Sequence, residues 1–330
     1  MPVPPSLSNL CGHILEYEKG RHATDPVRLG AVFRDYAELE RTPTLIETVE
    51  LIRSFGINIE SVGYLKSGGT SMKANGSWYI HYSASDKPAT QKYTIFHELF
   101  EIIQQNIGEL DSDYVVMSEP RLSQYADRFA AAALIPPRFF LDRASVAGFD
   151  LVALGEELEL SHQCLMIAFG QHFSDVPLVG ALYEYLPESE NGASPEIKDF
   201  TATVVAKTPQ ARGIKSLCSL QTVPSRNSRP RAGSLVCAAV RGGKSLLWRS
   251  ARTEESPLVL VRPLLSATQG PYRVILLAVP GDEFGLISSQ AEGIDPIHVS
   301  EEHSCPSAKS CPIADECSWN LGGTYDEFGI

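Results

Sequence analysis

The first half of the chain contains both helical and extended patterns of apolar residues. Apolar residues at three- and four-residue spacing indicate helices, and short runs that alternate with polar residues, rich in β-branched or aromatic side chains, indicate strands. Pro and Gly mark several of the predicted ends. The predicted order is helix 44–54, strand 57–62, strand 78–82, helix 90–106, helix 121–134, helix 151–159 and helix 161–171.

The second half has the pattern of a β-rich region. Residues 187–199 are polar and contain Pro, Gly and Ser, which is typical of a linker. Gly242-Gly243 precede Lys244 and Ser245, but Ala238 stands where a phosphate-binding loop needs its first glycine, so this segment is interpreted as the tight turn of a hairpin. The predicted strands are 201–208, 234–241, 244–252, 258–262 and 272–279.

These elements predict an α+β fold in four parts. Residues 1–187 form a zincin-like domain of helices and a sheet, and 188–199 form a linker. Residues 200–297 form a β-rich, sensor-like domain of the GAF or PAS kind, and 298–330 form a cysteine-containing tail.

Composition and charge narrow the class of protein. The 330 residues are 43% hydrophobic, which excludes a disordered chain. The net charge of -12 argues against a general binder of nucleic acid or membranes. No apolar run is long enough for a membrane span, and the N-terminus lacks the pattern of a signal peptide, so a cytoplasmic location is expected. The charge is unevenly distributed: ten Lys or Arg and no acids lie between Phe200 and Thr253, and six acids with only Lys309 follow from Glu301 onward.

The helix at 90–106 carries the strongest chemical signal. His97 and Glu101 lie one turn apart, so both side chains could reach one cation, and Glu98 could take a proton from a water bound to that cation. This is the arrangement of HExxH zinc peptidases with the second histidine replaced by a carboxylate, which is also a zinc ligand.

The surrounding motifs resemble those of the ImmA/IrrE metallopeptidase family. A strand is followed by Tyr93-Thr-Ile-Phe-His97-Glu98-Leu-Phe-Glu101, which is similar to the family's F-T-x-x-H-E-x-x-H. The next helix, from Ser123 to Pro136, is similar to E-x-x-A-N-x-F-A-A-x-x-L-M-P. The resemblance covers about 45–187.

The resemblance implies a fold, a metal and an activity. In the family, the two histidines of the first motif and the first Glu of the second bind zinc, and the Glu after the first His is the general base. Glu98 is then the base, with His97 and Glu101 as ligands of zinc or another divalent metal. Ser123 replaces the expected Glu ligand, so Asp127, one turn later, is the predicted third ligand, with Glu119 as the alternative.

The end of the chain predicts a second metal site. Cys305, Cys311 and Cys317 are spaced C-x5-C-x5-C, which resembles the cysteine spacing of iron–sulfur repressors. Thiolates are the ligands that iron–sulfur clusters require, so a cluster is predicted, with zinc as second choice and His303 as fourth ligand. The alternatives for that fourth ligand are His298, Glu302, Cys218 and Cys237; Cys11 and Cys164 are expected in the core.

Two functions remain open. The first is a stress- or redox-responsive regulator that cleaves a protein, with a helix-turn-helix repressor as the expected substrate. The second is a family member that has lost catalysis and acts as a metal-sensing transcriptional accessory or binding protein. The helices at 151–159 and 161–171 are too poor in basic residues to favour direct DNA binding, although the acid-free stretch from Phe200 to Thr253 could contact nucleic acid or an acidic partner.

Overall fold

The computed structural model describes two compact units. Unit 1 comprises Met1–Ala144 and Leu151–Ala168, and unit 2 comprises Ser145–Asp150 and Phe169–Ile330. The residues described are 6–18, 25–111, 113–114, 117–118, 121–146, 150–173, 176–186, 197–218, 221–231, 233–248, 258–266, 270–279 and 297–299.

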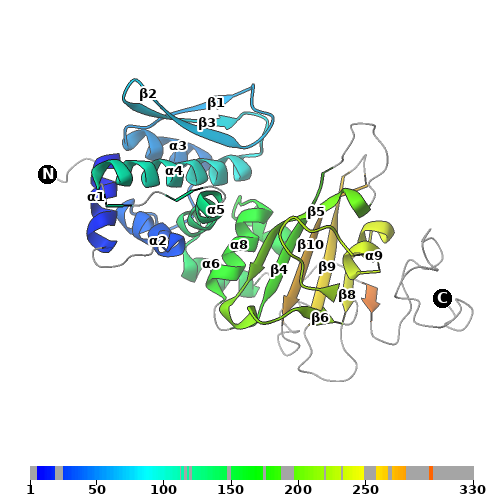
Figure 1. Ribbon diagram of the computed structural model, residues 1–330. Coiled ribbons are helices and arrows are strands. Elements are labelled where there is room, and N and C mark those ends of the chain that lie inside the picture. The colour runs from blue at the N-terminus through cyan, green and yellow to red at the C-terminus, as the bar shows by residue number, and fades with distance from the viewer. Residues whose placement is uncertain are drawn as a thin grey trace, which may run out of the picture. The chain divides into compact units, whose positions relative to one another are not determined.

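Unit 1 combines helices with a small sheet (Figure 1). Its helices are α1 (Leu7–Glu18), α2 (Pro26–Tyr36), α3 (Leu45–Ser54), α4 (Pro88–Leu110), α5 (Arg121–Leu134), α6 (Pro137–Val146), α7 (Leu151–Glu157) and α8 (His162–His172), of which α6 and α8 end in unit 2. Its strands are β1 (Asn58–Val62), β2 (Gly69–Ala74) and β3 (Ser77–Ser83). The order is β1-β3-β2, with β1 parallel and β2 antiparallel to β3.

Helix α4 is the centre of unit 1. Thirteen of its residues are buried, because one side packs on β2 and β3 and the other on α5, α1 and α3. Its Phe96 ring lies 5.6 Å from the ring of Phe33 on α2, which lies 5.8 Å from Phe129 on α5. These edge-to-face contacts join three helices that are far apart in the sequence.

Helices α2 and α5 approach unusually closely. A Cβ added at Gly30 of α2 would lie 2.6 Å from the Cβ of Ala132 and 3.0 Å from the backbone nitrogen of Ala133. Only glycine opposite an alanine-rich face allows this packing. Arg34 strengthens it by donating to the carbonyl of Ala133 at 3.2 Å.

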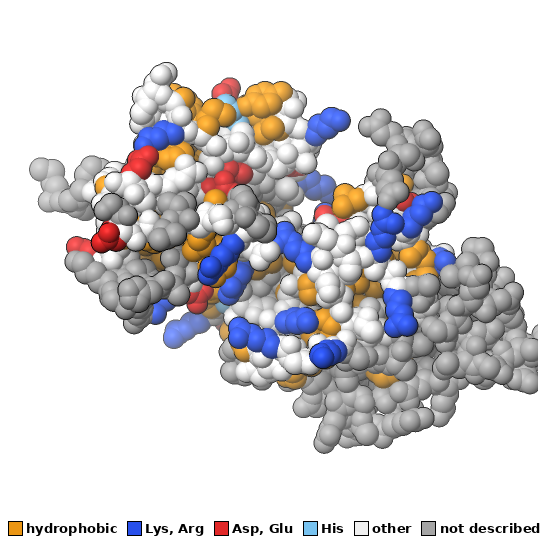
Figure 2. Space-filling view, viewed as in Figure 1, with side chains coloured by type: hydrophobic (Ala, Val, Ile, Leu, Met, Phe, Trp, Pro, Cys, Tyr) orange, Lys and Arg blue, Asp and Glu red, His pale blue; other side chains and the backbone are white. Residues whose placement is uncertain are grey.

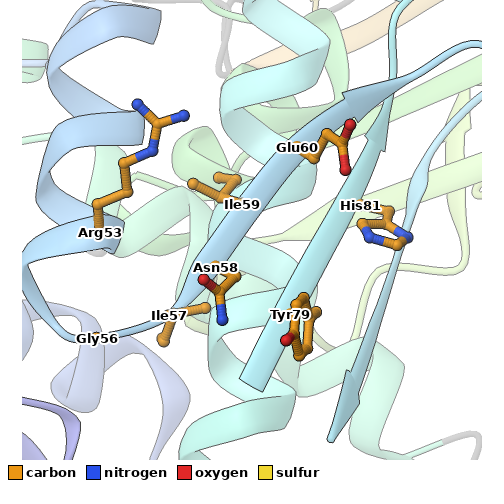
Figure 3. A pocket seen from close by; sticks show the side chains of 8 residues that line it. All are labelled: Arg53, Gly56, Ile57, Asn58, Ile59, Glu60, Tyr79 and His81. Carbon is orange, nitrogen blue, oxygen red and sulfur yellow. The ribbon is translucent and has the colours of Figure 1, made fainter. Parts of the chain in front are cut away.

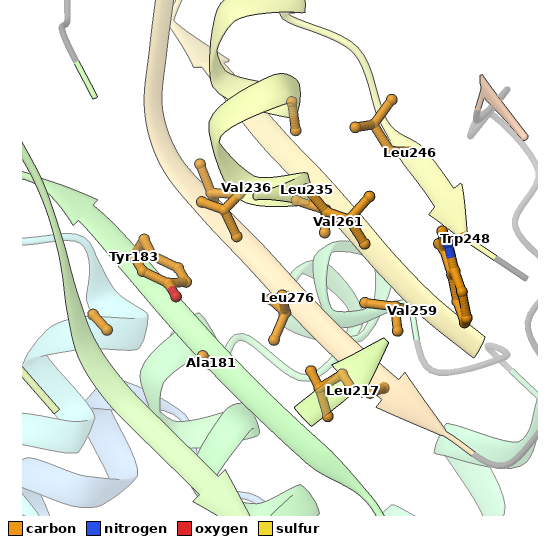
Figure 4. Packing of buried hydrophobic residues seen from close by; sticks show 14 of the residues in the cluster. Ala181, Tyr183, Leu217, Leu235, Val236, Leu246, Trp248, Val259, Val261 and Leu276 are labelled. Atoms are coloured by element: carbon orange, nitrogen blue, oxygen red, sulfur yellow. The ribbon is translucent and has the colours of Figure 1, made fainter. Parts of the chain in front are cut away.

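Unit 2 is built on a six-stranded sheet. Its elements are β4 (Val179–Tyr185), η1 (Ile197–Asp199), β5 (Phe200–Lys207), η2 (Pro209–Ala211), β6 (Ser216–Cys218), β7 (Gln221–Thr222), α9 (Leu235–Gly242), β8 (Leu246–Trp248), β9 (Leu258–Ser266), β10 (Gly270–Val279) and β11 (Ile297–Val299). The strand order is β11-β8-β9-β10-β4-β5, antiparallel except for β11 with β8, and β6 pairs with β7. Figure 4 shows Tyr183, Val261 and Leu276 of the sheet packed with Leu235 and Val236 of α9 in one apolar core.

The α+β prediction is confirmed, and most helices of unit 1 lie where the sequence predicts them. The predicted domain end at 187 does not coincide with the division between the units, since β4 pairs with both β5 and β10 and therefore belongs to unit 2. The polar segment 187–199 joins two neighbouring strands of one sheet. Polar composition indicates a connection, but it does not show whether the connection lies between domains or within one.

The predicted strand 234–241 and its hairpin are wrong, because Leu235–Gly242 is the helix α9. Ser234 caps the helix by accepting from the backbone N–H of Cys237 at 3.2 Å, and Gly243 ends it in the left-handed conformation with φ 60°. A short run of apolar residues fits a buried helix as well as a buried strand, so alternation alone could not distinguish the two.

Within the described ranges, no helix has the length and apolar character needed to cross a membrane.

The close contact of α2 with α5 predicts opposite effects for one chemical change at two glycines. Gly30→Ala should lower the free energy of unfolding by about 1–3 kcal/mol, because the added methyl group overlaps Ala132. Gly12→Ala is the matched control, since nothing lies within 4 Å of its added Cβ, and it should raise stability by about 0.5–1 kcal/mol through helix propensity. Urea unfolding measures both, and equal shifts in the same direction would refute the overlap.

Candidate functional site

The site lies on the face of α4 that carries His97 and Glu101. The two residues are one turn apart, and His97 Nε2 lies 3.5 Å from Glu101 Oε1. Ser71 of β2 contacts the other oxygen of Glu101 at 3.5 Å, so the sheet also holds this carboxylate. Both His97 and Glu101 are partly exposed, with side-chain exposures of 18% and 21%.

Strand β2 passes directly over Glu98. A Cβ at Gly69 would lie 2.5 Å from Thr94 and 3.4 Å from the Cγ of Glu98, so a glycine is needed where the strand crosses α4. Glu98 is only 7% exposed. Burial, followed by the charge of Glu101, raises the pKa of Glu98, and hydrogen bonds with Ser71 oppose that rise.

A second carboxylate lies on the opposite side of the His97 ring. Asp127 of α5 places its Oδ1 3.1 Å from His97 Nδ1. The same oxygen accepts a hydrogen bond of 2.8 Å from the Tyr93 hydroxyl, and Gln163 of α8 donates to that hydroxyl at 3.3 Å. Asp127 is therefore fixed by two neighbours from α4.

The neighbours of His97 favour the protonated form of its ring. Burial by itself would lower the pKa of His97, but hydrogen bonds to Asp127 and Glu101 and the nearby negative charges outweigh it and raise the pKa to about 10. The His97 ring thus lies between two carboxylates, and Tyr93 and Gln163 complete the network. We call Tyr93, His97, Glu101 and Asp127 the His97 cluster.

The His97 cluster does not fit the zinc ion that this motif predicts. A cation on Nε2 could be shared with Glu101, and a cation on Nδ1 with Asp127, but the two nitrogens point in different directions, so no single cation reaches all three residues. Among the described residues, no group of three or more His, Cys, Asp or Glu side chains is arranged to hold a metal.

The structure thus brings the predicted site residues together in a different way. His97, Glu98 and Glu101 lie on α4 as expected, and Asp127 reaches His97, but as a hydrogen-bond acceptor for the ring. The hydroxyl of Tyr93 was missed. It stands where the motif has Phe, four residues before His97, and that helical spacing is the signal that could have found it.

The cysteine predictions have separate outcomes. Cys11 and Cys164 are fully buried, which confirms their place in the core, and burial raises the pKa of the Cys11 thiol to about 12. Cys237 lies buried in α9. Other predicted ligands lie outside the described residues: Glu119, Glu302, His303, Cys305, Cys311 and Cys317.

Comparison with known proteins finds a family match for part of unit 1. Residues 52–167 match the peptidase M78 family model, described as the IrrE N-terminal-like domain. The chain therefore carries an ImmA/IrrE-type domain, which confirms the resemblance predicted from its motifs.

The overall fold is also found in a solved structure. A Mycobacterium tuberculosis transcriptional regulator is similar with a TM-score of 0.55 and 13% sequence identity, over 90% of this chain and 89% of that chain. At that identity the likeness shows a shared fold alone. A search of curated proteins found no match.

The contacts of the His97 cluster predict that Asp127 stabilises the domain. Asp127→Asn should lower the free energy of unfolding by about 1–3 kcal/mol, because His97 and Tyr93 lose an anionic hydrogen-bond acceptor while the side chain keeps its shape. Ser123→Ala on the same helix is the control and should change stability by less than about 0.5 kcal/mol. Chemical denaturation of both variants decides the matter, and an Asp127→Asn protein as stable as the wild type would show that the pair contributes nothing.

Proposed function

We propose that this protein is a transcription regulator whose ImmA/IrrE-type domain binds a protein partner without cleaving it. The observation that carries the proposal is the His97 cluster, in which the two ring nitrogens of His97 contact two different carboxylates, Glu101 and Asp127, on opposite sides of the ring. The non-catalytic function, one of the two that the sequence left open, is therefore the one we favour.

The departures from the family motif support this proposal as a set. Tyr93 replaces Phe, Glu101 replaces the second His, Ser123 replaces Glu and Asp127 replaces Asn. Three of these four positions contact His97 or one another: Tyr93 with Asp127 at 2.8 Å, Asp127 with His97 at 3.1 Å, and His97 with Glu101 at 3.5 Å. The changes compensate one another in charge and hydrogen bonding, which favours a rebuilt stabilising network over a damaged metal site.

The surface beside the cluster is suited to a protein partner. Strand β2 is an edge of its sheet, so one side of its backbone has no strand partner among the described residues. Gly69 and Ser71 hold this edge against α4 next to Glu98 and Glu101. An extended segment could pair with β2 there. A helix-turn-helix repressor, the kind of protein that relatives of this domain cleave, is the partner we propose.

The regulatory role is supported by the fold of the whole chain. The similar solved structure is described as a transcriptional regulator, and the likeness spans both units. We propose that unit 2 serves as a sensor-like domain in a cytoplasmic protein that responds to redox state or stress.

Unit 2 also carries a positively charged stretch that is suited to binding anionic molecules. Between Phe200 and Trp248 it carries eight Lys or Arg residues and no acid. Figure 2 shows Lys and Arg side chains spread over the described surface of unit 2, with few acids between them.

The expected effect of Glu98→Gln separates binding from cleavage. The variant should keep its regulatory output, because the proposed function needs no general base, whereas a peptidase would lose about 10²–10⁴ of its rate. Target-gene transcripts in a strain expressing only the variant measure this. Glu16→Gln is the control, since Glu16 is an exposed acid on α1 and lies outside both α4 and β2.

A metallopeptidase with an altered ligand set is the second candidate. The 3.5 Å between His97 Nε2 and Glu101 Oε1 favours it, because ligands at about 2.0–2.2 Å from a tetrahedral zinc ion are separated by about that distance. If metal near one equivalent disappears in His97→Ala, and Glu98→Gln abolishes both the output and cleavage of the partner, this candidate replaces the first.

The tail is proposed to supply the signal through an iron–sulfur cluster, with zinc as the alternative. Protein purified without oxygen should absorb at about 400 nm and contain iron and sulfide. The Cys311→Ser variant should lose nearly all of its iron and sulfide, because a cluster needs its thiolate ligands. Cys11→Ala is the control and should retain the cluster, and Cys237→Ala tests whether Cys237 is the fourth ligand. A colourless, iron-free wild type that contains zinc would support the alternative.

A further inference from the structure

Strand β1 forms the other edge of the unit 1 sheet, on the side away from β2. It pairs with β3 from Asn58 to Val62 and has no partner strand on its outer side among the described residues. A pocket of about 610 Å³ opens along this edge, lined by Arg53, Gly56, Ile57, Asn58, Ile59, Glu60, Tyr79 and His81. This pocket is separate from the His97 cluster.

The pocket has two kinds of wall. Ile57 and Ile59 are 2% and 7% exposed and belong to the core of the unit. Figure 3 shows Asn58 and Glu60 on the other side of the strand, with Tyr79 and His81 beside them on β3. Four consecutive residues thus line the pocket, Ile57 and the first three residues of β1, so the pocket lies along the backbone of an edge strand and meets side chains from both of its faces.

The open face beside the pocket is held in place by side-chain contacts. The Tyr64 hydroxyl lies 2.5 Å from His81 Nδ1, and the two rings meet edge to face with centroids 6.0 Å apart. His81 is therefore fixed before any ligand arrives. Less ordering is then needed when a partner binds.

Two exposed charges lie at different points along β1. Arg53, near the end of α3, lies next to the start of the strand, and Glu60 is at the strand's midpoint. Among the described residues neither forms an ion pair within 4 Å. A bound strand could therefore meet a positive charge near one end and a negative charge near its middle.

We propose that the free edge of β1 binds an extended peptide segment of a partner protein, which adds to the sheet as an antiparallel strand. A basic side chain of the peptide lies opposite Glu60, and an acidic side chain three residues later lies beside Arg53. A separation of three residues places the two peptide side chains on opposite faces of the added strand, because strand side chains alternate. Glu60 lies on the open face of the sheet, and Ile57, which is next to Gly56 and Arg53, lies on the face toward the helices. This site is additional to the partner site proposed at β2 and does not depend on it.

A second copy of the chain fits this edge less well. Symmetric antiparallel pairing of two β1 strands about their midpoint would place Glu60 directly opposite Glu60. Like charges in that position destabilise a strand pair. The occupant is therefore a segment with the complementary pattern of charge.

A labelled peptide tests the proposal on the full chain. The probe is a fluorescent nonapeptide of alternating Thr and Val with one Lys three residues before one Glu, measured by fluorescence anisotropy. Arg53→Glu should weaken its binding about tenfold by placing like charges together. Arg138→Glu, an exposed arginine on α6, is the matched control and should leave binding unchanged.

Two further probes decide between backbone pairing and simple charge attraction. Exchanging the Lys and Glu of the peptide should weaken binding to the wild type and restore it to the double variant Arg53→Glu, Glu60→Lys. Methylating the peptide's backbone nitrogens on one edge should abolish binding. The proposal is overturned if no peptide binds, if both arginine variants weaken binding equally, or if light scattering shows a dimer that Glu60→Gln strengthens by removing the repulsion. The Glu98→Gln output is independent of all these outcomes.

Discussion

The burial of α4 is the constraint on which unit 1 depends. Its residues pack on the sheet on one side and on α5 on the other, and the rings of Phe33, Phe96 and Phe129 join α2, α4 and α5. Because α4 also carries His97, Glu98 and Glu101, the core and the candidate site occupy one helix. Changes at the site therefore act on a helix that cannot move without disturbing the core.

Much of this fold could be predicted from the sequence, because its longest elements have clear patterns. The helix Arg121–Leu134 was predicted to the residue, since Pro136 and Pro137 fix its end. The short element Leu235–Gly242 could not be, because every residue in its first six positions is apolar and alternation has nothing to detect. The division between the units also escaped prediction, since the pairing of β4 with β10 joins residues about 90 positions apart, which no local pattern records.

The site was predictable in its positions but not in its chemistry. Helical spacing placed His97 and Glu101 together correctly. Which atom of Asp127 faces which nitrogen of His97 depends on the packing of α5 against α4, and sequence spacing carries no information about that. The hydroxyl of Tyr93 turns the aromatic position of the motif into a hydrogen-bond donor, so the contacts of the residues that depart from the motif say more about the site than the number of residues that match it.

The close approach of Gly30 to Ala132 has a consequence for how the domain can be isolated. The segment that matches the family model, 52–167, begins after α2, yet α2 covers the alanine-rich face of α5 and contributes Phe33 to the aromatic contacts. A fragment that begins and ends at the family boundaries would expose that apolar face to solvent, where it would promote aggregation. The segment recognisable by sequence is thus smaller than the part that can remain folded and soluble, and expression of unit 1 has to begin before α2.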